Sequence, residues 1–382
     1  MPVPRKEFEE RIKKARKRMT EEKLDALIAY GDTKITGNVR YISGYSARFG
    51  GYVCTSRSEW VTFGRAAVVV PLEGEPTLIT DCAFAEKAVR ELSVLENLKF
   101  STDFKDIADL LKKNQKGRIG ISTWDRFPHS MYAALKERLP KATLLPSFIV
   151  EDLRMVKSPA EIEILRKAAE VADEGVGVAI KALAEGKSEK EIHEAAENAM
   201  ELRNPSPRFV EPTNILSFGV RTALGGPYPS GAKLRKGDMV MMDVCNEYDG
   251  YAGDITRMKV FGTPTRDQRE LYELNLQMDE KAINAIRPGA KARDIWDAAV
   301  KVAREAGYEK YVRPCVSHGI GLDVAEKPGH NGVDETRLVP NMVLTCEPAI
   351  CTTNLGSSIE DMVLVTETGR ELLTKYEKSL EL

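Results

Sequence analysis

Carboxylates set in apolar, strand-like runs constrain this chain more than any other feature. Asp243 and Asp254 lie in MVMMDVCNEYDGYAGDITRMKVFG, while Glu347 and Glu360 lie in VLTCEPAI and SIEDMVLV. A buried carboxylate without a partner is costly, and neighbouring carboxylates raise one another's cost. His318, in SHGIGLDVAEKPG, adds an imidazole to these hard oxygen donors. Any one of these residues alone would be an ordinary polar side chain at a strand end, but all five together predict a site for divalent metal, with room for two carboxylate-bridged ions.

The spacing of these residues predicts two hairpins. A turn at Asp249–Gly250 would pair the strand of Asp243 with that of Asp254, and a second hairpin across a TNLGSS loop would pair the runs of Glu347 and Glu360. Thr256 shares a strand face with Asp254, so it is either a donor that orients a ligand carboxylate or a plain strand former. Cys245 shares the face of Asp243, which favours a wall of the pocket over an extra soft ligand.

The order Asp, Asp, His, Glu, Glu in these settings resembles the creatinase/prolidase/methionine aminopeptidase superfamily, the pita-bread metallopeptidases of peptidase family M24. The likeness extends along nearly the whole chain: residues 38–45, NVRYISGY, resemble the N-terminal-domain signature, and residues 153–173 resemble the segment that opens the catalytic domain. Because methionine aminopeptidases generally lack the N-terminal domain, the chain looks closest to the Xaa-Pro dipeptidase and Xaa-Pro aminopeptidase branch.

The resemblance implies an α/β N-terminal domain over residues 1–152 and an α+β pita-bread catalytic domain with a curved antiparallel sheet over residues 153–382. The sequence pattern agrees with this division. Short strand-like runs alternate with helical ones in the first half, which favours a mixed sheet. Ser158–Pro159–Ala160–Glu161 has the cap, proline and early acid of a helix start. Strand-like runs dominate from Asp238 onward.

The resemblance also assigns roles to the five residues. Asp243 would hold one metal, Asp254 and Glu360 would bridge both metals, and His318 and Glu347 would complete the second. The activity implied is hydrolysis of an amide or peptide bond by a metal-bridging hydroxide, in the manner of an Xaa-Pro dipeptidase or aminopeptidase, with Glu347 as the proton shuttle. The cofactors implied are two divalent ions, Mn²⁺ or Co²⁺ first, with Zn²⁺ and Fe²⁺ as alternatives.

Three positions depart from the family pattern. Relatives commonly carry histidines where this chain has Gly225–Gly226 in TALGGPYP, Ala325 in Val324–Ala325–Glu326, and Pro314. In the family those histidines bind substrate and stabilise the tetrahedral intermediate, each donor contributing about 2–4 kcal/mol. The pattern therefore predicts an intact metal site with a changed substrate pocket around Gly226 and Ala325.

Several readings of that pocket stay open. Arg221 either binds a substrate carboxylate or forms a surface salt bridge, and His330, in KPGHNG, either turns into the site or is an exposed loop residue. The missing histidines keep a second function in view: the same scaffold acting on a small non-peptide substrate, either as a hydrolase of a cyclic or guanidino amide or as a lyase. A non-catalytic binding protein is the third, although a binder has no need of clustered carboxylates.

Composition limits the partners. The net charge of −2 and the isoelectric point near 6.2 give no electrostatic basis for binding nucleic acid or a membrane surface. The sequence shows neither an apolar run of about 18 residues nor the apolar core of a signal peptide. Six scattered cysteines without a CxxC pair indicate free thiols in a cytoplasmic protein. The expected partners are a small-molecule or dipeptide substrate and, by resemblance, a second copy in a homodimer.

Overall fold

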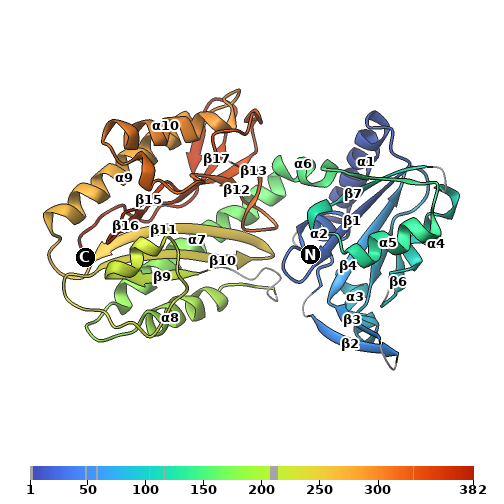
Figure 1. Ribbon diagram of the computed structural model, residues 1–382, viewed down its shortest axis with the longest axis horizontal. Helices are drawn as coiled ribbons and strands as arrows, with labels where there is room; N and C mark the ends of the chain where they lie inside the picture. Colours follow the sequence, from blue (N-terminus) through green and yellow to red (C-terminus); the bar gives the residue numbers. More distant parts are fainter. Residues whose placement is uncertain are drawn as a thin grey trace. The chain divides into compact units, whose positions relative to one another are not determined.

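The computed structural model describes residues 3–47, 50–56, 59–102, 104–114, 117–206, 214–329 and 331–382, with the backbone alone over 51–62. The chain divides into two compact units, Met1–Arg154 and Met155–Leu382 (Figure 1). Across the described ranges, no helix combines the length and the apolar character that crossing a membrane requires.

The N-terminal unit is built on a six-stranded mixed sheet with the order β6-β5-β4-β1-β7-β8. The central strand β1 pairs antiparallel with β4 and parallel with β7, as the alternation of short strands and helices predicts. The strands are β1 (Ala26–Asp32), β4 (Arg65–Pro71), β5 (Thr77–Thr80), β6 (Asn97–Phe100), β7 (Arg118–Ser122) and β8 (Thr143–Pro146), with a separate hairpin of β2 (Gly51–Ser56) and β3 (Glu59–Phe63).

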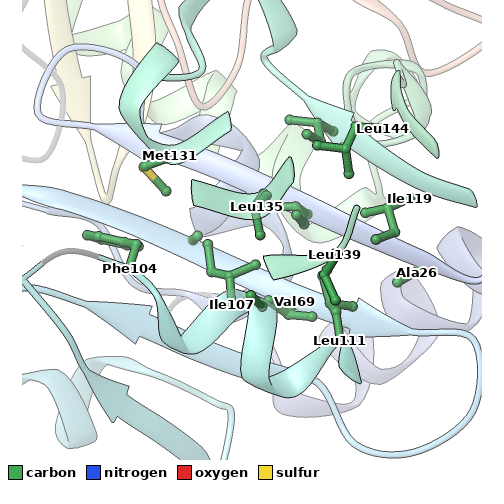
Figure 2. Packing of buried hydrophobic residues seen from close by; sticks show 14 of the residues in the cluster. Ala26, Val69, Phe104, Ile107, Leu111, Ile119, Met131, Leu135, Leu139 and Leu144 are labelled. Atoms are coloured by element: carbon green, nitrogen blue, oxygen red, sulfur yellow. The ribbon is translucent and has the colours of Figure 1, made fainter. Parts of the chain in front are cut away.

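Helices cover this sheet and enclose its core. The buried side chains of β1 and β7 pack against α4 (Asp106–Leu110) and α5 (His129–Arg138), where Ile107, Leu135 and Ile119 meet (Figure 2). The remaining helices of the unit are α1 (Arg5–Glu21), α2 (Gly37–Ser43), α3 (Glu86–Leu92) and α6 (Ile149–Met155).

A glycine separates the hairpin of β4 and β5 from β3. β3 ends at Phe63, and β4 starts at Arg65. The residue between them, Gly64, has a φ of 92°, which an L side chain rarely adopts, and its N–H donates to Asp81 Oδ1 at 2.9 Å. The hairpin consists of β4 and β5 alone.

The second unit carries a sheet of β9 (Ile215–Phe218), β10 (Met239–Tyr248) and β11 (Tyr251–Val260) in the order β11-β10-β9. The turn at Asp249–Gly250 joins β10 to β11 in the predicted antiparallel hairpin, because Asp249 and Gly250 both adopt positive φ. Buried residues of α7 (Pro159–Ala182) and α8 (Glu189–Glu201) pack against this sheet.

A five-stranded sheet with the order β13-β12-β14-β17-β18 completes the unit. Helices α9 (Arg266–Ala285) and α10 (Ala292–Glu305) cover it, with Met278, Ala299 and Val363 in one buried cluster. The strands are β12 (His318–Gly319), β13 (Glu326–Gly329), β14 (Val343–Cys346), β17 (Asp361–Val365) and β18 (Arg370–Leu372), with the hairpin of β15 (Ala349–Cys351) and β16 (Gly356–Ser358) beside them.

The two sheets meet where β11 approaches β17. Thr256 and Glu360 form an antiparallel bridge, in which the Glu360 N–H donates to Thr256 O at 3.1 Å. Arg257, one residue on, donates to Glu360 O at 2.6 Å and to Asp361 Oδ1 at 2.7 Å. This contact places the carboxylates of the two predicted hairpins on neighbouring strands.

Capping boxes fix the starts of three helices. The predicted start at Ser158 is confirmed: Ser158 Oγ accepts from Glu161 N, and the Glu161 carboxylate accepts from Ser158 N. Ser188 and Thr265 cap α8 and α9 in the same way.

The last residues of the chain pack into this unit. Lys378 Nζ lies 2.5 Å from Asp279 Oδ2 and 2.5 Å from Asp361 Oδ2, while the Val260 N–H donates to Leu380 O at 2.9 Å. The terminal segment therefore joins an ion network directly behind Glu360.

Candidate metal centre

The hairpin β10–β11 places two acids side by side. Cys245 is opposite Asp254 in the register, and Asp243 is opposite Thr256. The Cys245 thiol donates to Asp254 Oδ1 at 3.0 Å, and its sulfur lies 3.9 Å from Asp243 Oδ1. Asp254 and Cys245 are buried, whereas Asp243 is partly exposed. Cys245 therefore touches both carboxylates instead of only lining a wall.

The second sheet supplies the other three residues. Glu347 follows β14, Glu360 precedes β17, and His318 opens β12. His318 Nε2 lies 3.5 Å from Glu347 Oε1 and 3.9 Å from Glu360 Oε1. Its Nδ1 lies 3.0 Å from Gly319 O, so a tautomer protonated at Nδ1 leaves Nε2 as a lone-pair donor toward the acids. The side chains thus converge from strands far apart in the sequence.

The ligand atoms form two groups that share one residue. One atom each from Asp254, His318 and Glu360 lies within 4.8 Å of the others, and the same holds for Asp243, Cys245 and Asp254. Through its contact with His318, Glu347 joins the first group. A shared carboxylate between two donor groups is the arrangement that two bridged ions require.

The pKa values of three of these acids are raised, which shows that their ionised forms are destabilised in the cluster. Desolvation, and then the charges of Asp254 and Glu347, raise the pKa of Asp243 well above its ordinary value. Desolvation likewise raises the pKa of Asp254 to about 6, although His318 opposes it, and raises the pKa of Glu360 well above its ordinary value. A cation within the cluster removes this conflict, because it favours the ionised forms.

Glu360 gives a direct test of whether a metal fits. Thr256 Oγ1 donates to Glu360 Oε2 at 2.9 Å, but the buried Oε1 has no hydrogen-bond partner among the described residues. A buried carboxylate oxygen without a donor is costly, and a metal ligand bond satisfies it. Hard carboxylate oxygens and one imidazole suit divalent transition metals, so the residues present fit the predicted ions.

Arg221 lies in an ion pair that accounts for its charge. Its Nε donates to Glu189 Oε1 at 2.9 Å, and its Nη2 donates to Tyr228 O at 3.0 Å. Glu189 is fully buried and also accepts from Phe218 N and Ser230 N. These contacts favour the salt-bridge reading of Arg221 over carboxylate binding.

The residues at the positions of the family histidines have no side-chain group that could donate a hydrogen bond to a substrate. Gly226 has a φ of 124°, and a Cβ there would lie 2.9 Å from Ile215 Cδ1, so a side chain would be strained and crowded. Ala325 and Pro314 are exposed. His330 lies outside the described residues. None of the replacements that the structure describes carries a positive charge.

Arg313 supplies such a charge, and the sequence analysis missed it. Its Nη1 lies 3.6 Å from Glu347 Oε2. In KYVRPCVSH it reads as an ordinary charged loop residue, five positions before His318. No periodicity or motif identifies Arg313, because its position depends on a backbone contact with β15.

The chain matches two family models. Residues 163–367 match Metallopeptidase family M24, and residues 11–156 match the Creatinase/Prolidase N-terminal domain. The Xaa-Pro dipeptidase of Pyrococcus furiosus is 35% identical over 98% of this chain and 100% of its own length. The Xaa-Pro dipeptidase of Pyrococcus horikoshii is 32% identical over 97% of this chain and 98% of its own length.

Solved structures agree with these matches. The prolidase of P. horikoshii superposes with a TM-score of 0.83 at 30% identity, covering 97% of this chain and 99% of that one. The prolidase of P. furiosus gives a TM-score of 0.80 at 32% identity, covering 95% and 100%. They confirm the predicted fold class, an α/β N-terminal domain followed by a pita-bread catalytic domain.

Proposed function

Because this chain belongs to metallopeptidase family M24 and is a metal-dependent hydrolase of peptide bonds, we propose that it cleaves Xaa-Pro dipeptides. The observation that carries the proposal is the convergence of Asp254, His318 and Glu360, with ligand atoms within 4.8 Å of one another, beside Asp243 and Glu347. Two relatives that match almost the whole chain are Xaa-Pro dipeptidases, which supports this substrate class.

The residues of the site have two roles, metal binding and proton transfer. Asp243, Asp254, His318, Glu347 and Glu360 would hold two divalent ions, and Thr256 fixes one oxygen of Glu360. Such ions would supply Lewis-acid polarisation of the scissile carbonyl and a nucleophilic water at neutral pH. Glu347 accepts the proton of the attacking water on a carboxylate oxygen and delivers it to the leaving nitrogen.

The competing substrate class has less support. The case for a small cyclic or guanidino amide hydrolase, or for a lyase, rests on the absence of three histidines. Arg313, 3.6 Å from Glu347, provides a positive charge in the same region, so the absence no longer requires another chemistry. The matched relatives are dipeptidases, which also favours a peptide substrate over this alternative.

Further properties belong to the same proposal. The metals are Mn²⁺ or Co²⁺, since hard oxygen ligands dominate and one imidazole completes them. The functional domains are an N-terminal domain over residues 1–152 and a catalytic domain over 153–382, which the division at Arg154 supports. The thiols of Cys82, Cys245, Cys346 and Cys351 form no disulfide, which supports a cytoplasmic location. The family resemblance supports a homodimer, which light scattering would test.

A substrate screen tests the proposed function. The purified protein, loaded in turn with Mn²⁺, Co²⁺, Zn²⁺ or Fe²⁺, is assayed against Xaa-Pro dipeptides, longer Xaa-Pro peptides and small cyclic amides. We expect metal-dependent release of proline, fastest from dipeptides and abolished in Glu347→Gln. Asp267→Asn, an exposed acid at the start of α9, serves as the control and should retain full activity. Preference for a cyclic amide would overturn the proposal.

A further inference from the structure

Arg313 is held beside the metal centre by its backbone. It lies between a short helical turn at Glu309–Tyr311 and β12. Its N–H donates to Ala349 O at 3.0 Å, and the preceding Val312 bridges to Ile350. The strand that anchors it, β15, begins two residues after Glu347. These contacts fix the backbone of Arg313 beside the metal centre.

The guanidinium N–H groups of Arg313 make no hydrogen bond with the described residues. The separation of 3.6 Å between Nη1 and Glu347 Oε2 is too long for a good hydrogen bond. Over the described ranges, no acceptor lies within hydrogen-bond reach of its guanidinium. Two other arginines of this unit, by contrast, use their donors in hydrogen bonds. Arg221 is held by Glu189 and Tyr228, and Arg257 is held by Asp361 and the carbonyls around it. Among the described residues, Arg313 is thus a cation whose hydrogen-bond donors remain available to a ligand.

A ligand can reach this cation. The side chain of Arg313 is 33% exposed, and Gly225 presents no side chain toward it. A Cβ at Gly225 would lie 3.9 Å from Arg313 Cδ and 3.3 Å from Cys351 Sγ, so any larger residue would fill the space beside the arginine stem. The glycine, with a φ of 70°, keeps that space open.

The charge of Arg313 acts on the same acids as the metals. Its guanidinium is always protonated, and Nη1 lies 3.6 Å from Glu347 Oε2. An anionic substrate group entering a cluster of four carboxylates needs a cation to offset the repulsion. A guanidinium with free fork-shaped donors recognises a carboxylate through two parallel hydrogen bonds.

We propose that Arg313 binds the free carboxylate of the substrate and so restricts this enzyme to peptides that end one residue after the scissile bond. This inference rests on the proposed dipeptidase function and names the residue that sets its substrate length. Arg313 directly precedes Pro314, one of the positions that depart from the histidine pattern. Arg221, a candidate from the sequence, is already engaged by Glu189 and Tyr228.

The test compares an acid with its amide. Gly-Pro and Gly-Pro-amide are assayed with the Mn²⁺-loaded wild type, Arg313→Lys, Arg313→Met and the control Arg266→Met, whose arginine is exposed and paired with Glu270. We expect Arg313→Met to raise KM for Gly-Pro about 10- to 100-fold with kcat changed less than about threefold, because a charge-assisted hydrogen bond is lost. Gly-Pro-amide should be a poor substrate for the wild type and no worse for the variant. Arg313→Lys should lie between.

A binding measurement separates this inference from the proposed function. Calorimetry with L-proline and L-prolinamide needs no turnover; the wild type should prefer proline, and Arg313→Met should lose that preference while keeping its metal content and melting temperature. Equal loss of kcat on both substrates would show that Arg313 serves Glu347 and overturn the inference. Unchanged kinetics would overturn it as well. A wild type that hydrolyses neither substrate with any of the four metals would instead overturn the proposed function, leaving the binding preference to decide the role of Arg313.

Discussion

Thr256 and Glu360 are joined twice, once through the backbone and once through their side chains. The Glu360 N–H donates to Thr256 O at 3.1 Å, and Thr256 Oγ1 donates to Glu360 Oε2 at 2.9 Å. Both residues are buried; Thr256 lies in β11, and Glu360 directly precedes β17 of the other sheet. The pair therefore sets the position of a proposed bridging carboxylate at the junction of the two halves of the catalytic unit.

Replacing Thr256 by valine tests that junction. Thr256→Val keeps the volume but removes the hydroxyl, so Glu360 loses the donor that fixes its orientation. We expect metal affinity to fall about 10- to 100-fold, as for other residues that orient metal ligands. Thr345→Val is the matched control, since the Thr345 hydroxyl is buried and makes no hydrogen bond within the described ranges. Titration with Mn²⁺ measures both; equal affinities in the two variants would contradict this role for Thr256.

The proposed bridging acids should control metal content. Asp254→Asn and Glu360→Gln should each bind less metal than the wild type after dialysis against Mn²⁺ or Co²⁺. With metal present, both variants should melt at lower temperature, because binding to the folded state stabilises it less. Without metal at pH 7.5, both should be at least as stable as the wild type, because one clustered charge is gone. Elemental analysis and thermal melts check this, and wild-type metal content in either variant would refute the ligand assignment.

The raised pKa values predict an unusual pH dependence for the metal-free protein. Asp254 has an ordinary pKa of 3.8 when unfolded and about 6 when folded, so the folded state binds the proton more tightly. Its contribution to stability is present below pH 4 and is lost as the pH rises to about 6. Asp243 and Glu360 shift in the same direction. Added metal should therefore raise the melting temperature more at pH 7.5 than at pH 5, and an equal rise at both would contradict the shifts.

Arg221 should matter for stability and not for substrate. Arg221→Met removes a partner from the fully buried Glu189 and should lower the free energy of unfolding by about 2 kcal/mol. The N–H groups of Phe218 and Ser230 still bind that carboxylate, which limits the loss. Urea unfolding measures the change, with the exposed Arg266→Met as control. A large rise in KM for dipeptides at unchanged stability would restore Arg221 as a substrate-binding residue.

The strands and helices around the site could be predicted from local signals. Turn residues at Asp249–Gly250 identify the β10–β11 hairpin, and the Ser158 cap identifies the start of α7. The apolar runs around Asp243 and Asp254 identify a metal site because burial and like charge conflict there. Each of these signals is contained within a short stretch of sequence.

Contacts between distant segments could not be predicted in this way. The bridge of Thr256 to Glu360 joins residues of two sheets, and the position of Arg313 depends on Ala349 in a hairpin beyond His318. The strand pattern places Cys245 on the ligand face, but only the register shows that its thiol donates to Asp254. These relationships arise from sheet packing and register, which no single segment encodes.

The contacts of Lys378 affect the order in which the charges behind Glu360 are balanced during synthesis. Its ammonium group lies between Asp279 and Asp361, the residue directly after Glu360, and Arg257 holds the other side of Asp361. During translation, Glu360 emerges before the lysine that neutralises the acids behind it. A ribosome-bound chain that ends before residue 378 holds these acids without that cation. The catalytic unit thus gains this cation only after Lys378 has been joined.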